Sequence, residues 1–185
     1  MISDELEVLK IVANKLDSAE IKYIISGSVA ANFYAQPRMT RDIDIVIWVT
    51  TFKADNVYDL FKEDFYIDRD SVDEAIKNTG MFNIIHNELV VKVDFIVAGD
   101  SEYNKMRLKR RKINVVEGVS LSIISPEDLI LSKLLWSKDS HSEMQLRDVR
   151  NILVFNKNRL DFSYLEEWAT KLTVKSLLEE CLKNG

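Results

Sequence analysis

Residues 42–49 constrain the fold more than any other segment, because they read Asp-Ile-Asp-Ile-Val-Ile-Trp-Val. The density of β-branched residues predicts a central strand. Side chains alternate between the two faces of a strand, so Asp42, Asp44, Val46 and Trp48 share one face and the isoleucines share the other. The first face becomes apolar after Asp44. We therefore expect both carboxylates at one end of a buried strand, at the mouth of the sheet.

A third acidic residue, Asp94, lies in a second β-branched run, residues 91–97. An unpaired carboxylate is costly to bury in such a run. An isolated Asp-x-Asp is more often a strand face that begins in solvent, but a third carboxylate on a neighbouring strand changes that balance. Like charges repel at short range, and a divalent cation relieves the repulsion. We predict that Asp42, Asp44 and Asp94 bind Mg²⁺ or Mn²⁺.

The pair Gly27–Ser28 follows a short apolar run at residues 23–25 and precedes a helical pattern at residues 29–34. Where a strand enters a helix, free backbone N–H groups favour a phosphate. The glycine lets phosphate oxygens approach the backbone, and the serine adds a hydroxyl donor. A Gly-Ser turn alone is more often simple turn chemistry, so its weight comes from its spacing to the acidic pair.

The remaining patterns predict an α/β (α+β) chain with a mixed sheet. We expect helices at residues 4–19, 29–34, 54–62 and 73–78, strands at 23–25, 42–49, near 66, 81–86 and 89–97, and a hairpin at 113–124. Ser125 caps a helix whose first residue is Pro126, and the chain from there to Leu182 reads as three or four helices. We expect a core at residues 1–124 and a C-terminal helical extension at 125–185, packed together as one structural domain.

Composition excludes several classes of protein. The chain has 185 residues, of which 46% are apolar and 30% charged, as in compact globular proteins rather than disordered ones. No window approaches the roughly 18 apolar residues of a membrane helix. The single Cys181 cannot form an internal disulfide and the N-terminus lacks a signal-peptide core, so we expect a cytoplasmic protein without membrane contact. His86 and His141 stand too far apart for a zinc site, and no Walker motif follows Gly27.

A basic run occupies residues 105–112, although the net charge of the chain is −5. The overall charge does not suggest a dedicated nucleic-acid binder. Clustered Lys and Arg side chains bind a polyanionic acceptor such as tRNA, or they form a solvated helix face, and the sequence leaves both interpretations open.

Together these motifs resemble the DNA polymerase beta-like nucleotidyltransferase superfamily. The resemblance covers about residues 20–150 and is carried by Ile25–Ser28, Asp42–Ile45 and Val93–Phe95. Within that superfamily, residues 37–44 and 125–129 with Lys133 resemble small prokaryotic proteins related to AbiE-type toxins, the minimal nucleotidyltransferases. The resemblance implies a mixed sheet flanked by helices. It also implies transfer of a nucleoside monophosphate from a nucleoside triphosphate to an acceptor, with pyrophosphate leaving.

The same resemblance implies roles for individual residues. Asp42 and Asp44 would bind both metal ions, and Asp94 would bind the catalytic one and help deprotonate the acceptor. The remaining predicted site residues are Gly27 and Ser28 on the β- and γ-phosphates, Arg38, Arg41 and Lys133 on the nucleotide, and Thr40 and Asp148 as accessory residues.

Four of these residues have a second interpretation. Arg38 and Arg41 also suit surface ion pairs, and Lys133 also suits a side chain that extends from an apolar helix face to solvent. Asp148, within Arg147–Arg150, also suits a structural ion pair.

We expect a nucleoside triphosphate as one partner, while the acceptor stays open between an RNA end, a protein hydroxyl and a small molecule such as an aminoglycoside. A toxin-like role would add an antitoxin partner. A module of the same fold that binds nucleotide or partner without turnover is the alternative. Three like charges kept together argue against that alternative, because they have no evident structural use.

Overall fold

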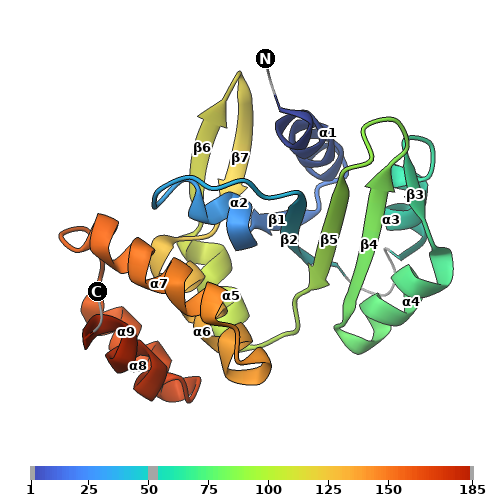
Figure 1. The fold of residues 1–185 in the computed structure, drawn as a ribbon. Coiled ribbons are helices and arrows are strands. Elements are labelled where there is room, and N and C mark those ends of the chain that lie inside the picture. The colour runs from blue at the N-terminus through green and yellow to red at the C-terminus, as the bar shows by residue number, and fades with distance from the viewer. Residues whose placement is uncertain (1–2, 50–53, 184–185) are drawn as a thin grey trace. The chain divides into compact units, whose positions relative to one another are not determined.

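The computed structural model describes residues 3–49 and 54–183. The chain divides into two compact units (Figure 1). Unit 1 comprises the residues up to Val29 together with Met39–Ile123, and unit 2 comprises Ala30–Arg38 together with the residues from Ile124 onward.

Within the described residues, unit 1 contains a seven-stranded mixed sheet in the order β3-β4-β5-β2-β1-β7-β6. Strand β2 runs parallel to β5 and β1 runs parallel to β7, while the other neighbours are antiparallel. The predicted α/β class with a mixed sheet is therefore confirmed. The strands are β1 (Lys22–Ile25), β2 (Asp42–Trp48), β3 (Phe65–Ile67), β4 (Met81–His86), β5 (Lys92–Val97), β6 (Lys112–Val116) and β7 (Val119–Ile123).

Helices cover the apolar face of this sheet. Helix α1 contacts β1, β2 and β7, α3 contacts β3, and α4 contacts β4. The isoleucines of β2, Ile43, Ile45 and Ile47, are fully buried on this face, as the strand pattern predicts. The helices of unit 1 are α1 (Asp4–Ser18), the start of α2 (Gly27–Ala31), α3 (Ala54–Phe61), α4 (Arg69–Asn78) and α5 (Glu102–Arg110).

An aromatic cluster fixes the central strands against those helices. The ring centroid of Phe95 on β5 lies 5.0 Å from that of Phe82 on β4 and 5.5 Å from that of Phe61 on α3. Aromatic contacts at such separations stabilise a core beyond the apolar area that they bury. Because side chains alternate along β5, burial of Phe95 directs Asp94 to the opposite face of the sheet.

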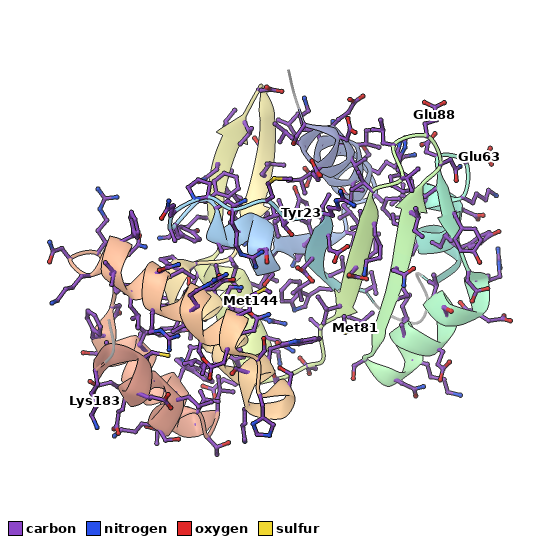
Figure 2. All side chains as sticks on the ribbon, viewed as in Figure 1. Tyr23, Glu63, Met81, Glu88, Met144 and Lys183 are labelled. Carbon is purple, nitrogen blue, oxygen red and sulfur yellow. The ribbon has the colours of Figure 1, made fainter. Side chains whose placement is uncertain are left out.

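Several predicted element boundaries differ from the structure, among them those of α2, β5 and α4. Strand β5 begins at Lys92 rather than Leu89, because residues before it form the turn after β4, where Val90 has φ +53° and its N–H bonds to the carbonyl of His86. Figure 2 shows Glu88 on this turn. Helix α4 begins at Arg69 rather than at residue 73, because the side chain of Asp68 caps its first turn.

Unit 2 is helical within the described residues. Its helices are α6 (Pro126–Ser140), α7 (Glu143–Asn156), α8 (Phe162–Lys171) and α9 (Lys175–Lys183), which confirms the predicted three or four helices. Ser125 caps α6 as predicted, because its hydroxyl accepts a hydrogen bond from the backbone N–H of Asp128 at 3.1 Å. Packing of the 125–185 extension on the 1–124 core as one structural domain stays a prediction.

The segment Ala30–Arg38 belongs to unit 2 through specific hydrogen bonds. The hydroxyl of Tyr34 donates to the carbonyl of Ile124 at 2.6 Å, and the amide of Asn156 donates to the carbonyl of Tyr34 at 2.6 Å. These contacts hold an early part of the sequence against the C-terminal helices. In the part of the chain that the structure describes, no helix has the length and apolar character needed to span a membrane.

Candidate active site

The parallel pairing of β2 with β5 brings the three predicted carboxylates onto one face of the sheet. In this register Asp42 stands opposite Lys92, and Asp44 stands opposite Asp94. Strand β4 adds Asn83 beside Asp94 on the same face. The side chain of Asp42 is 58% exposed and that of Asp94 is 18% exposed, so the acidic end of the face opens toward solvent, while Ile43 and residues 45–47 of β2 are buried.

Lys92 lies among these carboxylates. Its Nζ is 2.7 Å from Oδ2 of Asp94 and 3.8 Å from Oδ1 of Asp42. The hydrogen bond with Asp94 raises the pKa of Lys92 above its ordinary value, and the negative charges of Asp94, Asp42 and Asp44 act in the same direction. Sequence reasoning missed this residue. The signal was available, since Lys92 precedes Asp94 by two positions in a strand and so shares its face.

Gly27 packs directly against Asp44. A Cβ atom at this glycine would lie 2.6 Å from Cγ and 2.8 Å from Cβ of Asp44, and the backbone has φ +60°, where only glycine is unstrained. The N–H of Ser26 donates to the carbonyl of Asp44 at 2.8 Å. The predicted phosphate turn at Gly27–Ser28 therefore lies beside the acidic pair.

The donor atoms of Asp42, Asp44 and Asp94 suit a hard divalent cation, because Mg²⁺ and Mn²⁺ prefer carboxylate oxygens. Within residues 3–49 and 54–183, however, the structure contains no group of three or more His, Cys, Asp or Glu side chains arranged to hold a metal ion. Two of the three carboxylates contact Lys92 instead. The carboxylate oxygens suit Mg²⁺ or Mn²⁺, but in this conformation the three side chains are not arranged around one metal position.

A second cluster of predicted site residues forms within unit 2. Oδ2 of Asp148 accepts hydrogen bonds from Nζ of Lys133 at 2.9 Å and from Nη2 of Arg38 at 3.1 Å. Lys133 also donates to Oε1 of Gln145 at 3.0 Å. The side chains of Lys133 and Asp148 are 3% and 5% exposed. The interpretation of Lys133 as a side chain reaching to solvent is wrong, because its ammonium group is buried in this ion pair.

The environment of Asp148 predicts a pH dependence of stability. Burial raises the pKa of this carboxyl, but the hydrogen bonds and charges of Arg38 and Lys133 outweigh burial and lower it below its ordinary value. A lowered pKa in the folded state adds stability above the unfolded pKa of about 3.9, and this is lost as pH falls through the folded pKa. We expect the difference in unfolding free energy between the wild type and Asp148→Asn to shrink between pH 6 and pH 3. Urea titrations at several pH values would measure it, and a constant difference would contradict it.

Each unit has a hollow. The one in unit 2 has a volume of about 310 Å³ and is lined by Ala31, Asn32, Ala35, Gln36, Pro37, Arg38, Arg147, Asp148 and Asn151. It is bordered by the Arg38–Asp148 ion pair. The one in unit 1 has a volume of about 220 Å³, and its lining includes Tyr23, Ser120 and Ser122 but none of the predicted site residues.

The two remaining predicted site residues precede the acidic pair in the sequence, and neither is fully buried. Thr40 donates through its hydroxyl to the carbonyl of Asp42 at 3.3 Å, and Arg41 is exposed.

The basic run lies largely on α5, where the guanidinium of Arg107 stands 5.8 Å from the ring centroid of Trp48. One cation of that run therefore contacts an aromatic ring. Contact of the run with a polyanion stays a prediction.

Comparisons with known proteins agree with this architecture. The family model described as "Nucleotidyl transferase of unknown function (DUF2204)" matches residues 5–182. A comparison with curated proteins finds no match.

Several solved structures share the fold. An antigenic nucleotidyltransferase-like protein from Paracoccidioides brasiliensis has a TM-score of 0.56 and 20% identity, over 96% of this chain and 91% of that one. The lincosamide antibiotic adenylyltransferase LnuA, solved with lincomycin, has a TM-score of 0.54 and 13% identity, over 82% and 96%. ANT(2″)-Ia, solved with adenylyl-2″-tobramycin, has a TM-score of 0.57 and 13% identity, over 92% and 97%. The mixed sheet with flanking helices is thus that of nucleotidyltransferase-like proteins.

Proposed function

This chain belongs to the nucleotidyl transferases of unknown function (DUF2204), and from that premise we propose that it moves a nucleoside monophosphate from a nucleoside triphosphate to an acceptor in a reaction that needs Mg²⁺ or Mn²⁺. One observation carries the proposal: the β2–β5 register sets Asp42, Asp44 and Asp94 on one sheet face, with Gly27 packed against Asp44. Carboxylates gathered beside a glycine turn suit a metal-bound triphosphate.

In this proposal Asp42, Asp44 and Asp94 would hold the metal, which would supply positive charge against the phosphates. Asp94 accepts the proton of the acceptor hydroxyl. The acceptor oxygen bonds to the α-phosphorus, the bond from that phosphorus to the bridging oxygen breaks, and pyrophosphate leaves. Backbone N–H groups at Gly27 and Ser28, with the serine hydroxyl, bind the β- and γ-phosphates. Helix α2 has only five residues, so these N–H groups matter more than its dipole.

Further residues are proposed to contact the nucleotide. Arg38 and Arg41 supply positive charge suited to a triphosphate, while the ammonium group of Lys133 neutralises the buried carboxylate of Asp148. Thr40 supports the acidic pair through its hydrogen bond to the carbonyl of Asp42, and Asp148 orients the guanidinium of Arg38.

The structural neighbours favour ATP as donor and a small-molecule hydroxyl as acceptor. LnuA is named as a lincosamide antibiotic adenylyltransferase, and ANT(2″)-Ia was solved with adenylyl-2″-tobramycin. An RNA end or a protein hydroxyl is the competing acceptor class. An AbiE-like toxin role with an antitoxin partner is a second hypothesis, based on the sequence motifs around Arg41 and Lys133. The contrasting hypothesis is a module of the same fold that binds a nucleotide or a partner without catalysing transfer.

Calorimetric titration of each of the four nucleoside triphosphates in the presence of Mg²⁺ tests the proposal. We expect metal-dependent binding to the wild type and its loss in Asp42→Ala/Asp44→Ala, because that variant lacks two of the three carboxylates. The matched control is Asp70→Ala/Asp73→Ala, which removes two exposed carboxylates from α4 and should bind as the wild type does. A wild type that binds none of the triphosphates would overturn the proposal and favour the partner-binding module.

A further inference from the structure

Lys92 differs from the surface lysines of this chain because it joins two strands through their carboxylates. Its ammonium group reaches Asp94 on its own strand and Asp42 on β2, at 2.7 and 3.8 Å. By contrast, Lys62 pairs with Asp59 three residues earlier on the surface, at 2.8 Å. Lys92 therefore supplies positive charge at the point where the proposed metal ligands converge.

An ammonium group in this position and a divalent cation exclude each other. Mg²⁺ binds carboxylate oxygens at about 2.0–2.1 Å and demands nearly octahedral geometry. The hydrogen bond from Lys92 already engages Oδ2 of Asp94. Two positive centres cannot share that oxygen at bonding distance without strong repulsion. A cation that binds Oδ2 of Asp94 must therefore displace Lys92.

Lys92 is able to leave without unfolding the strand. Its side chain is 39% exposed, and a lysine has a flexible four-carbon stem that ends in a strongly hydrated charge. Once displaced, the ammonium group remains tethered at the mouth of the same face. A nucleoside triphosphate offers it new anionic oxygens there, and the phosphates also supply ligands to the cation.

We propose that Lys92 is a resident counter-ion of the carboxylate site, which a divalent cation must displace, and that metal binding is therefore weak until a nucleoside triphosphate is present. This inference rests on the proposed function, because it assumes that Asp42, Asp44 and Asp94 are the metal ligands. It makes the metal–nucleotide complex, rather than the free ion, the species that the protein recognises.

The test is calorimetric titration with Mn²⁺ alone on the wild type, Lys92→Met and Lys92→Arg. Methionine keeps the length of the side chain and removes the charge, so Mn²⁺ affinity should rise about tenfold or more, the order expected for removing one nearby competing charge at a partly exposed site. Lys92→Arg keeps the charge and should bind Mn²⁺ as weakly as the wild type. Lys62→Met, which removes an ion-paired lysine elsewhere in unit 1, is the matched control and should leave Mn²⁺ affinity unchanged.

Thermal unfolding gives a second readout. Without metal, Lys92→Met should melt at a lower temperature than the wild type, because Asp94 and Asp42 lose their counter-ion. Mn²⁺ should then restore more stability to the variant than to the wild type.

The outcomes separate this inference from the proposed function. The role of Lys92 would be overturned if the wild type and Lys92→Met bound Mn²⁺ with equal affinity. It would also be overturned if both bound Mn²⁺ only together with a non-hydrolysable ATP analogue. Either result would leave the proposed function standing. Failure of all variants to bind Mn²⁺ with or without the analogue would overturn both. A rise in affinity with Lys62→Met equal to that with Lys92→Met would show a general charge effect and also overturn it.

Discussion

Replacing Asp148 with alanine is expected to lower the free energy of unfolding by about 3–5 kcal/mol, the range found when one partner of a buried ion pair is removed. The reason lies in Lys133, which is 3% exposed and would keep its charge without a carboxylate nearby. The amide oxygen of Gln145 would be left as its hydrogen-bond acceptor. Arg38 is 30% exposed, so water replaces much of what it loses. Urea unfolding at pH 7 measures the change.

A double variant separates the ion pair from the packing of the same side chains. Asp148→Leu/Lys133→Met removes both charges and keeps approximate volume, so we expect it to recover most of the lost stability, as apolar replacements of buried ion pairs commonly do. If Asp148→Ala instead costs less than about 1 kcal/mol, the value of a surface pair, then the ion pair does not stabilise unit 2. Asp148 would then be held in place for another reason.

Replacing Gly27 with alanine is expected to lower the free energy of unfolding by about 2–4 kcal/mol and to abolish metal-dependent nucleotide binding. Alanine is strained at φ +60°, and its Cβ would overlap Cγ and Cβ of Asp44. Rotation of the carboxylate relieves only part of this overlap, because Cβ of Asp44 is fixed to the strand backbone. Relief therefore requires movement of α2 or of β2, and either shift displaces the carboxylate.

Gly118 provides the matched control for this substitution. It also has positive φ, +83°, but a Cβ there meets no atom within 4 Å. Gly118→Ala should therefore report backbone strain alone, about 1–2 kcal/mol, without any change in nucleotide binding. Chemical denaturation and nucleotide titration of both variants give the comparison. Equal losses of stability for the two glycines would mean that Asp44 yields freely to a side chain at residue 27.

Local patterns were sufficient to predict the strands that carry the acidic residues. Alternation along β2 identified Asp42 and Asp44 as neighbours on one face, and the structure confirms that face. The start signals around Ser125 were equally local, and the cap forms as predicted. The predicted start of β5 was wrong because Val90 lies in a turn rather than in the strand. The sequence pattern alone does not distinguish an apolar residue in a turn from one in a strand.

Contacts between distant segments were beyond the reach of those patterns. Arg38, Lys133 and Asp148 were each predicted for separate reasons, but their ion pairs depend on tertiary packing within unit 2. The role of Lys92 required the register of two parallel strands, which strand propensity alone does not give. Alternation along β5 places Lys92 on the same face as Asp94, but its contact with Asp42 could not be predicted without the register.

The β2–β5 register also bears on how this family can diversify. Asp44 meets Asp94 through direct pairing of two strands, although α3, β3, α4 and β4 intervene along the chain. We expect insertions or deletions in the loops of that intervening region to leave the pairing intact. A single-residue deletion inside β5 would instead turn Phe95 toward solvent and Asp94 into the core. We therefore expect natural sequences of this family to vary in length between the two strands and not within them. A change of length within β5 would disrupt the hydrophobic core and the acidic site together, because both depend on the same alternation.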